Sequence, residues 1–212
     1  MGREFIELFD RWADSYDATV TGHDEEYKEV FEGYDEILQE VASSVSGSVV
    51  EFGVGTGNLS EKLLTTAAQV TGVEPSEKMR AIASQKHPSM LVVEGDFLDH
   101  PIKENVDGIV STYAFHHLTD IEKKQAAENF YRILNKGGKV VFADTMFSSE
   151  TAKEEIIQNA ISRGFLNLAE DLQTEYYPYI GTMQEIFSQV GFHVELKQLN
   201  RFVWLFTAKK EN

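Results

Sequence analysis

The feature that most constrains the fold is a regular alternation, from Ser48 onward, between short apolar runs and longer segments of helical periodicity. The apolar runs are short and rich in valine, which predicts buried strands rather than helices. Strands that alternate with helices imply a parallel sheet with helices on both faces. The five predicted strands lie in SVVEFG, QVTGVE, MLVVEGD, VDGIVSTY and KVVFAD.

The end of the chain departs from this alternation. Its last two apolar runs, HVELKQL and FVWLFTAKK, are too close together for a crossover helix, so they predict an antiparallel hairpin. We therefore expect an α/β fold: a Rossmann-like doubly wound sheet of about seven strands, mostly parallel, with a C-terminal antiparallel hairpin. Helices are expected to begin near Asn58, Ser76 and Thr119, and Thr119 with Glu122 fits a capping box.

Two other parts of the chain are predicted to be helical. Residues 1–46 predict an N-terminal helical cap, followed by a core over residues 47–212. Residues 146–181 interrupt the alternation with two helical segments and the aromatic run EYYPYIG, which predicts an insertion. Thr182 and Glu185 predict the cap of one more helix, which Gly191 ends. In the N-terminal cap, one predicted apolar face contains Phe5, Leu8, Phe9 and Trp12.

Composition excludes several classes of protein. The chain has no cysteine, so disulfides and thiolate metal sites are absent. Its formal net charge of −16 argues against nucleic acid as a partner, because that binding depends on neutralising phosphates. No run approaches the ~18 apolar residues of a membrane span. The first residues lack the order of a secretion signal, so we expect a cytoplasmic protein.

Three glycines alternate directly after the first predicted strand, in VVEFGVGTGNLS. Gly53 suits a tight turn, and Gly55 and Gly57 allow close approach to the main chain, so the loop predicts a ligand site. The spacing is not that of the dinucleotide fingerprint, since position 58 is Asn. Glu51 would repel a phosphate. The ligand is therefore expected to be uncharged or positively charged on that side.

The pattern E-x-G-x-G-x-G after a first strand resembles the nucleotide-binding signature of class I S-adenosylmethionine-dependent methyltransferases. The resemblance extends from Val49 to the terminal hairpin, and the whole chain is most similar to the small YrrT-type bacterial methyltransferases. It implies S-adenosylmethionine as cofactor, a small-molecule methyl acceptor, and a monomer or homodimer. It also implies that the insertion, with Tyr176, Tyr177 and Tyr179, roofs the acceptor site.

Further cofactor contacts are expected at the ends of the next strands. Glu74 ends the second strand, where a carboxylate can accept hydrogen bonds from ribose hydroxyls, as in dinucleotide enzymes. The resemblance adds Asp96 and Phe97 beside the adenine, Ser111 near the methionine part, and Tyr16 from a segment that closes over the cofactor. The predicted cofactor-binding residues are Glu51, Gly53, Gly55, Gly57, Glu74, Asp96, Phe97, Ser111 and Tyr16.

The pair His116 and His117 follows the fourth strand and has three interpretations. A zinc site is disfavoured because adjacent histidines should point in different directions and no third ligand lies at metal spacing. No metal site is therefore predicted. One histidine could be a general base or a substrate contact, which makes the pair the candidate catalytic residues. Packing or cofactor contact is the third interpretation.

Two other functions stay open from the sequence. A non-catalytic S-adenosylmethionine-binding sensor or partner subunit would need the same binding residues. A nicotinamide oxidoreductase would need a third glycine at position 58. The first choice remains a methyltransferase that works by in-line displacement, for which the protein's main task is to align the reactants and exclude water.

Overall fold

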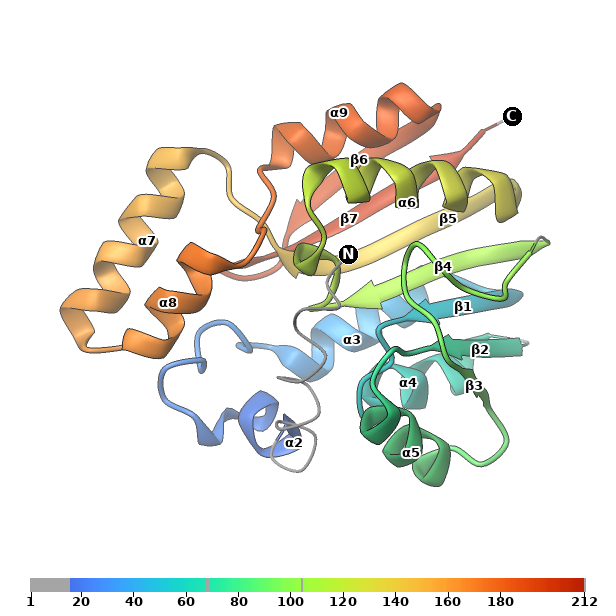
Figure 1. Ribbon diagram of the computed structural model, residues 1–212, viewed down its shortest axis with the longest axis horizontal. Coiled ribbons are helices and arrows are strands. Elements are labelled where there is room, and N and C mark those ends of the chain that lie inside the picture. Colours follow the sequence, from blue (N-terminus) through green and yellow to red (C-terminus); the bar gives the residue numbers. More distant parts are fainter. Residues whose placement is uncertain (1–15, 68, 104, 212) are drawn as a thin grey trace.

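The computed structural model describes residues 16–67, 69–103 and 105–211. Within them, seven strands form one sheet in the order β3-β2-β1-β4-β5-β7-β6 (Figure 1). Strands β1 to β5 are parallel, whereas β7 is antiparallel to both β5 and β6. This topology confirms the predicted fold class. The strands are β1 (Ser48–Phe52), β2 (Gln69–Val73), β3 (Leu91–Val93), β4 (Val106–Thr112), β5 (Leu134–Thr145), β6 (Phe192–Gln198) and β7 (Val203–Lys210).

The strand order reverses at β1, which pairs with β2 on one side and β4 on the other. In open parallel sheets a crevice forms at such a switch point, outside the carboxyl ends of the strands. The loop with the three glycines leaves β1 at this point. The topology alone therefore places the loop where a ligand can bind.

The helices that follow the strands begin close to the predicted positions. Helix α4 (Asn58–Thr66) starts at Asn58, and Ser76 caps α5 (Glu77–Lys86). Thr119 and Glu122 form the predicted capping box of α6 (Asp120–Ile133). The prediction for the last helix was wrong at its start: α9 (Ile180–Val190) has already begun at Thr182, although Gly191 ends it as expected.

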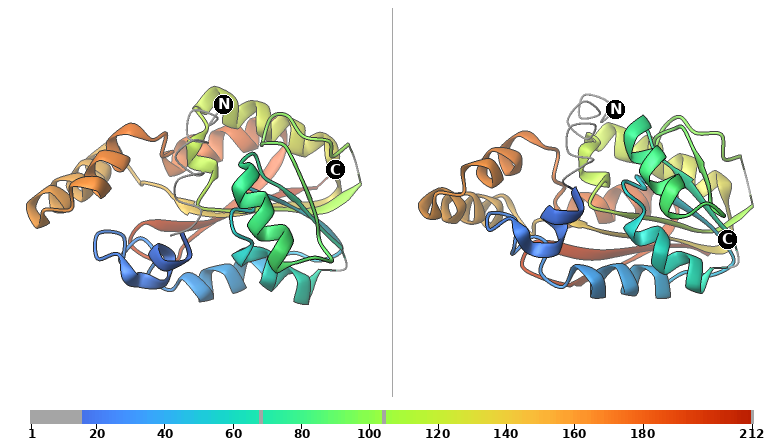
Figure 2. Two further views of the ribbon diagram at one scale, coloured as in Figure 1. Left: turned by 60° about the horizontal axis from the view of Figure 1, so that its bottom comes forward. Right: turned by 90° about the horizontal axis from the view of Figure 1, so that it is seen from below.

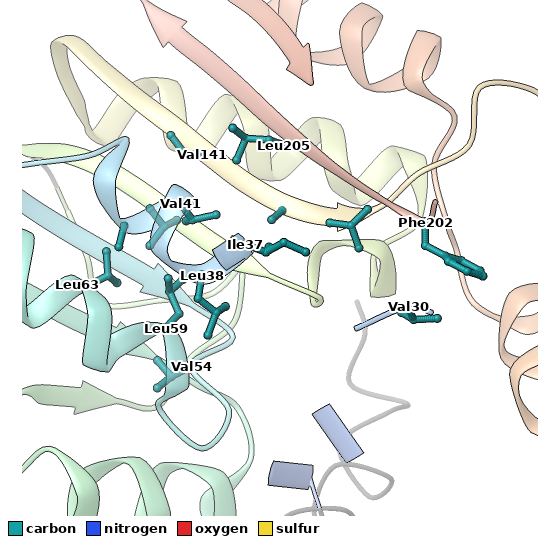
Figure 3. Packing of buried hydrophobic residues seen from close by; sticks show 14 of the residues in the cluster. Val30, Ile37, Leu38, Val41, Val54, Leu59, Leu63, Val141, Phe202 and Leu205 are labelled. Atoms are coloured by element: carbon teal, nitrogen blue, oxygen red, sulfur yellow. The ribbon is translucent and has the colours of Figure 1, made fainter. Parts of the chain in front are cut away.

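Helices cover both faces of the sheet, as Figure 2 shows in views nearly along its plane. On one face, α3 (Tyr34–Ser43) and α4 pack on the strands, and Val41 and Leu63 belong to the same buried cluster as Val141 and Leu205 (Figure 3). Burying one such aliphatic side chain contributes about 1.5–3 kcal/mol. On the other face, α6 and α9 enclose a cluster that includes Phe52, Phe97, Phe115, Phe130, Phe142, Phe187 and Phe206.

Two further helices lie beyond the carboxyl ends of β4 and β5 (Figure 1). These are α7 (Glu150–Arg163) and α8 (Leu166–Thr174), and they confirm the two helical segments predicted for the insertion. The chain before α3 contains α2 (Tyr16–Ala18) and η2 (Thr19–His23). Glu26 from this segment accepts hydrogen bonds from the backbone N–H groups of Asn167 and Leu168 at the start of α8. Hydrogen bonds therefore connect the start of α8 to the N-terminal segment.

The predicted apolar face of Phe5, Leu8, Phe9 and Trp12 lies outside the described residues. Over the part of the chain that is described, no helix combines the length and apolar character needed to cross a membrane.

Candidate functional site

A cavity opens at the carboxyl ends of β1, β2 and β4, with a volume of about 790 Å³ including space open to solvent. The candidate catalytic residue His117 lines this cavity. Four other predicted site residues do not line it, namely Glu51, Gly57, Ser111 and His116. The predicted cofactor residues that line it are Tyr16, Gly53, Gly55, Glu74, Asp96 and Phe97.

The three glycines of the loop differ in what surrounds them, although each has a positive φ, of 69°, 56° and 90° in chain order. A Cβ at Gly53 would lie 2.8 Å from the Ala114 Cβ, and one at Gly57 would lie 2.8 Å from the His87 ring. A Cβ at Gly55 would meet nothing within 4 Å. Protein packing therefore explains the missing side chains of Gly53 and Gly57, whereas Gly55 faces open space on the cavity.

Glu74 connects this loop to the end of β2. Its Oε2 accepts a hydrogen bond from the Gly55 N–H at 2.9 Å, and its Oε1 accepts one from the Ser76 N–H at 2.9 Å. The Ser76 bond lies at the start of α5, where a carboxylate is favoured by the helix dipole. The carboxylate is thus held in place at the edge of the cavity.

Glu51 is buried within β1 and accepts a hydrogen bond from the Ser60 hydroxyl of α4. Burial raises the pKa of Glu51 to about 8, against the hydrogen bond from Ser60 and with a smaller contribution from Glu74. Glu51 pairs with Gly72 of β2, two residues before Glu74, so the two carboxyl groups lie at the same end of the sheet. Glu51 sits behind the loop rather than on the cavity surface.

Asp96 and Phe97 come from the loop after β3. Asp96 Oδ1 accepts hydrogen bonds from the N–H groups of Leu98 and Asp99, which fixes the loop as well as placing the carboxylate at the cavity. The Phe97 ring stacks on Phe52 at 5.5 Å and is anchored in the phenylalanine cluster.

Two hydroxyl groups at the end of β4 stand out. The Ser111 Oγ and the Tyr113 hydroxyl are buried, and neither has a hydrogen-bond partner among the described residues. Tyr113 also has a φ of 52°, an uncommon conformation for a residue with a side chain. Buried polar groups are nearly always hydrogen-bonded, so both hydroxyls are unusual. Tyr113 lines both cavities, whereas Ser111 lines neither and lies beside Gly53.

The N-terminal segment closes over the glycine loop through Asp17, which the sequence analysis did not single out. Asp17 Oδ1 accepts hydrogen bonds from the Thr56 hydroxyl at 2.6 Å and the Asn58 amide at 3.1 Å. Lys86 binds Oδ2 at 2.6 Å. Burial opposes the charge of Asp17, but these three donors lower the pKa of its carboxyl. Asp17 therefore places the neighbouring Tyr16 on the cavity.

His116 and His117 form the short helix η3 (Phe115–His117) at the end of β4, and both are buried. Their rings lie side by side, with centroids 4.1 Å apart. Glu175, at the end of α8, approaches His116 Nε2 at 3.2 Å and His117 Nε2 at 3.6 Å. Both premises of the argument against a metal were therefore wrong, because the imidazoles face one carboxylate and that carboxylate is the third group.

The electrostatics of the two histidines differ. Burial opposes the charge of His116, but Asp144 and Glu175 raise its pKa to about 10. Burial and the neighbouring His116 lower the pKa of His117. Burial also opposes the charge of Glu175, but its hydrogen bonds with the two histidines lower its pKa. Asp144 and Glu175 were missed in the sequence, although Asp144 ends the strand KVVFAD at the same edge of the sheet.

A second cavity, of about 730 Å³ including open space, adjoins the first on the side of the insertion. Tyr16, Tyr113 and His117 line both cavities. Of the three tyrosines predicted over the acceptor, Tyr177 lines the second cavity, whereas Tyr176 is exposed and Tyr179 packs on the core.

Comparison with known proteins gives a consistent result. Residues 50–142 match a family described as a methyltransferase domain. The chain is 53% identical, over its whole length and that of the relative, to a protein of Bacillus cytotoxicus named an uncharacterized methyltransferase. It is 52% identical to one of Oceanobacillus iheyensis with the same name, over 99% of each chain. The fold is similar to that of the DhpI–SAH complex, with a TM-score of 0.74 at 15% identity over 99% of this chain and 97% of that one.

Proposed function

The chain belongs to the class I S-adenosylmethionine-dependent methyltransferases, and on this basis we propose that it transfers a methyl group to a small-molecule acceptor by in-line displacement. One observation carries the proposal: the open main chain at Gly55 and the carboxylate of Glu74 meet at the edge of one cavity, joined by a hydrogen bond of 2.9 Å. S-adenosylmethionine needs both features, because its ribose requires a hydrogen-bond acceptor and its amino-acid part requires open space beside the main chain.

The residues present suit this cofactor. The bend at Gly55 leaves room for a chain to lie against the backbone, and the unpartnered hydroxyl of Tyr113, which lines the cavity, can serve a polar group of a ligand. The first cavity is mostly apolar, as an adenine ring requires. When bound, the cofactor supplies a methyl group that its sulfonium already makes electrophilic.

In this proposal the protein's residues bind the cofactor and orient it. Glu74 accepts hydrogen bonds from the ribose hydroxyls, and Asp96 with Phe97 holds the adenine. Gly53 and Gly55 contact the amino-acid part through their backbone, with the Glu51 carboxylate behind them. Tyr16, placed by Asp17, covers the cofactor from the N-terminal segment.

The second cavity is the proposed acceptor site. It shares Tyr113 and His117 with the first cavity, so an acceptor there would face the cofactor across these two side chains. Its lining is mostly apolar and comes from the N-terminal segment, the end of β4 and the region of α8, which suits a small molecule held between these elements. His116 and His117 remain the candidate catalytic residues, and His117 is the one that lines both cavities. We further propose that the protein acts in the cytoplasm as a monomer or homodimer.

Calorimetry with S-adenosylmethionine and S-adenosylhomocysteine tests the cofactor. We expect both to bind, and we expect Gly55→Val to weaken binding by about 100-fold, because the new side chain fills the cavity. Gly137→Val is the matched control: Gly137 also has a positive φ and open surroundings, but lies outside the cavity lining. No binding to the unmodified protein at millimolar cofactor would reject the proposal.

A second measurement separates catalysis from binding alone. The protein with S-adenosylmethionine is incubated with pools of small metabolites, and S-adenosylhomocysteine is measured. Release that depends on the pool supports methyl transfer. Tight binding without release for any pool would indicate a cofactor-binding sensor or partner subunit instead.

A further inference from the structure

The orientation of His116 and His117 is fixed by oxygen atoms on their far sides. His116 Nδ1 lies 2.6 Å from Asp144 Oδ1, and His117 Nδ1 lies 2.9 Å from the backbone oxygen of Ala114. A backbone oxygen only accepts hydrogen bonds, so the Nδ1 of His117 carries its proton. Asp144 favours the same tautomer in His116. In both imidazoles the Nε2 atom then faces Glu175, and a bound metal ion would take the place of a proton on Nε2.

This is the arrangement that surrounds histidine ligands of metal ions in proteins. Such histidines donate Nδ1–H to a carboxylate or a backbone oxygen, which orients the ring and makes Nε2 a better ligand. Asp144 also accepts a hydrogen bond from the His116 backbone N–H at 3.0 Å, so ring and main chain are held by one carboxylate. The Tyr177 ring stacks on the His116 ring at 4.5 Å and fixes its plane.

The distances between the three groups suit a small divalent ion. One ligand atom from each of His116, His117 and Glu175 lies within 4.8 Å of the others. Ligand atoms ~2.0–2.2 Å from a tetrahedral zinc ion lie roughly 3.3 Å apart. The two contacts of Glu175 with the Nε2 atoms, at 3.2 and 3.6 Å, are close to this separation.

We infer that His116, His117 and Glu175 bind a divalent transition-metal ion, with zinc as the best match to two imidazoles and one carboxylate. Sites with three protein ligands keep a coordination position open for water or substrate. The three side chains all line the second cavity, so the open position faces the space proposed for the acceptor.

The surroundings can hold such a charge. The side chains of all three ligands are nearly inaccessible to solvent, and the carboxylates of Glu175 and Asp144 together compensate a divalent cation. The chain next to Glu175 is anchored by Lys123, which donates a hydrogen bond to the Tyr176 backbone oxygen at 2.8 Å. The third ligand is therefore fixed by a contact outside the cluster.

The ion would also narrow the class of acceptor, an extension that rests on the proposed function. A bound metal holds an oxygen atom of a substrate and orients it. We therefore expect the acceptor to carry a carboxylate or hydroxyl oxygen that binds the ion in the second cavity while the group to be methylated faces His117 and Tyr113.

Metal binding is tested on the full chain, untagged and treated with chelator, by titration with Zn²⁺ in a calorimeter and with Co²⁺ followed by its visible absorption. We expect one equivalent to bind. Glu175→Gln and His117→Ala should each weaken binding by about 100-fold or more, and Asp144→Asn by about 10–100-fold. Glu170→Gln is the matched control, because Glu170 is an exposed carboxylate of α8, the helix that Glu175 ends.

Two results would overturn the inference: no binding of either ion by the unmodified protein below millimolar concentration, or equal binding by Glu175→Gln and Glu170→Gln. Thermal unfolding with and without Zn²⁺ checks that each variant is folded, and the ion should raise the melting temperature of the unmodified protein but not that of Glu175→Gln. Cofactor binding is measured in the same variants. If the unmodified protein binds the cofactor but neither metal ion, the metal site alone is rejected, and if it does not bind the cofactor, the proposed function is rejected.

Discussion

The backbone N–H of Gly55 donates a hydrogen bond to Glu74 Oε2 at 2.9 Å, and this contact joins the loop after β1 to the carboxyl end of β2. Both residues line the first cavity. A ligand that displaces or shares this bond would contact the loop and the carboxylate together.

Replacing Glu74 should weaken cofactor binding. We expect Glu74→Ala to weaken S-adenosylhomocysteine binding by about 10–100-fold, since hydrogen bonds to a charged group contribute about 1.5–3 kcal/mol. Calorimetry measures the dissociation constant. Glu94→Ala is the control, because Glu94 is a largely exposed carboxylate just after β3, before the loop that contains Asp96 and Phe97. Equal affinities of the two variants would show that Glu74 does not bind the ligand.

Asp17 should stabilise the contact between the N-terminal segment and the glycine loop. Asp17→Ala removes the acceptor for both Thr56 and Asn58, so we expect faster amide hydrogen exchange in residues 16–23 and severalfold weaker cofactor binding. Lys86→Ala should have a smaller effect, because a partly exposed ion pair contributes only about 0–1 kcal/mol. A larger effect of Lys86→Ala would contradict the assignment.

The buried carboxyl of Glu51 predicts a pH dependence of stability. Its pKa rises from 4.5 in a solvated carboxyl to about 8 in the folded protein. Between these values the unfolded chain loses a proton that the folded protein keeps. The contribution of Glu51 to the free energy of unfolding is therefore fully present below about pH 4.5, falls by roughly 1.4 kcal/mol per pH unit, and is lost above about pH 8.

Glu51→Gln removes this titration. Urea unfolding at several pH values should show the variant gaining on the unmodified protein as the pH rises from 5 to 8, with no further gain above that. Glu61→Gln, at an exposed position of α4, is the control and should follow the unmodified protein throughout. A constant difference between Glu51→Gln and the unmodified protein would mean that Glu51 does not titrate in this range.

Lys123 is fully buried, and its amine donates hydrogen bonds to the backbone oxygens of Leu118 and Tyr176. Burial lowers its pKa to about 8. Lys123→Met leaves both oxygens without this donor, and an unsatisfied buried acceptor costs about 1–3 kcal/mol. We expect a loss of about 2 kcal/mol or more in urea unfolding at pH 7. Lys124→Met, at the exposed next position of α6, should change stability by less than about 0.5 kcal/mol.

Local patterns were sufficient for most of the fold. Valine-rich runs between helical segments have only one common solution, a parallel sheet covered on both faces, and a short final connection forces an antiparallel pair. Capping residues located the starts of α5 and α6 because a cap is a contact between residues three apart. The same rule failed at Thr182, since Tyr179, which has no capping side chain, precedes the first residue of α9.

In the candidate site, some residues could be predicted from the sequence and others could not. Gly55 and Glu74 could be predicted because each follows a strand that local sequence identifies, and parallel strands end at one edge of the sheet. The contacts of Asp17 with Thr56 and of Glu175 with His116 join residues far apart in the chain, 39 positions in the first case. The hydrophobic periodicity of a sequence carries no information about such contacts.

The order of residues along the chain therefore determined the sheet, the bend with its open glycine and the acid at the end of β2, because these depend on near neighbours. Only the tertiary structure decided that α8 ends over the two histidines, that their imidazoles face one carboxylate, and that Gly57 is bare because of His87. The physical reason is that packing between distant elements sets these distances, and packing is a property of the whole folded chain.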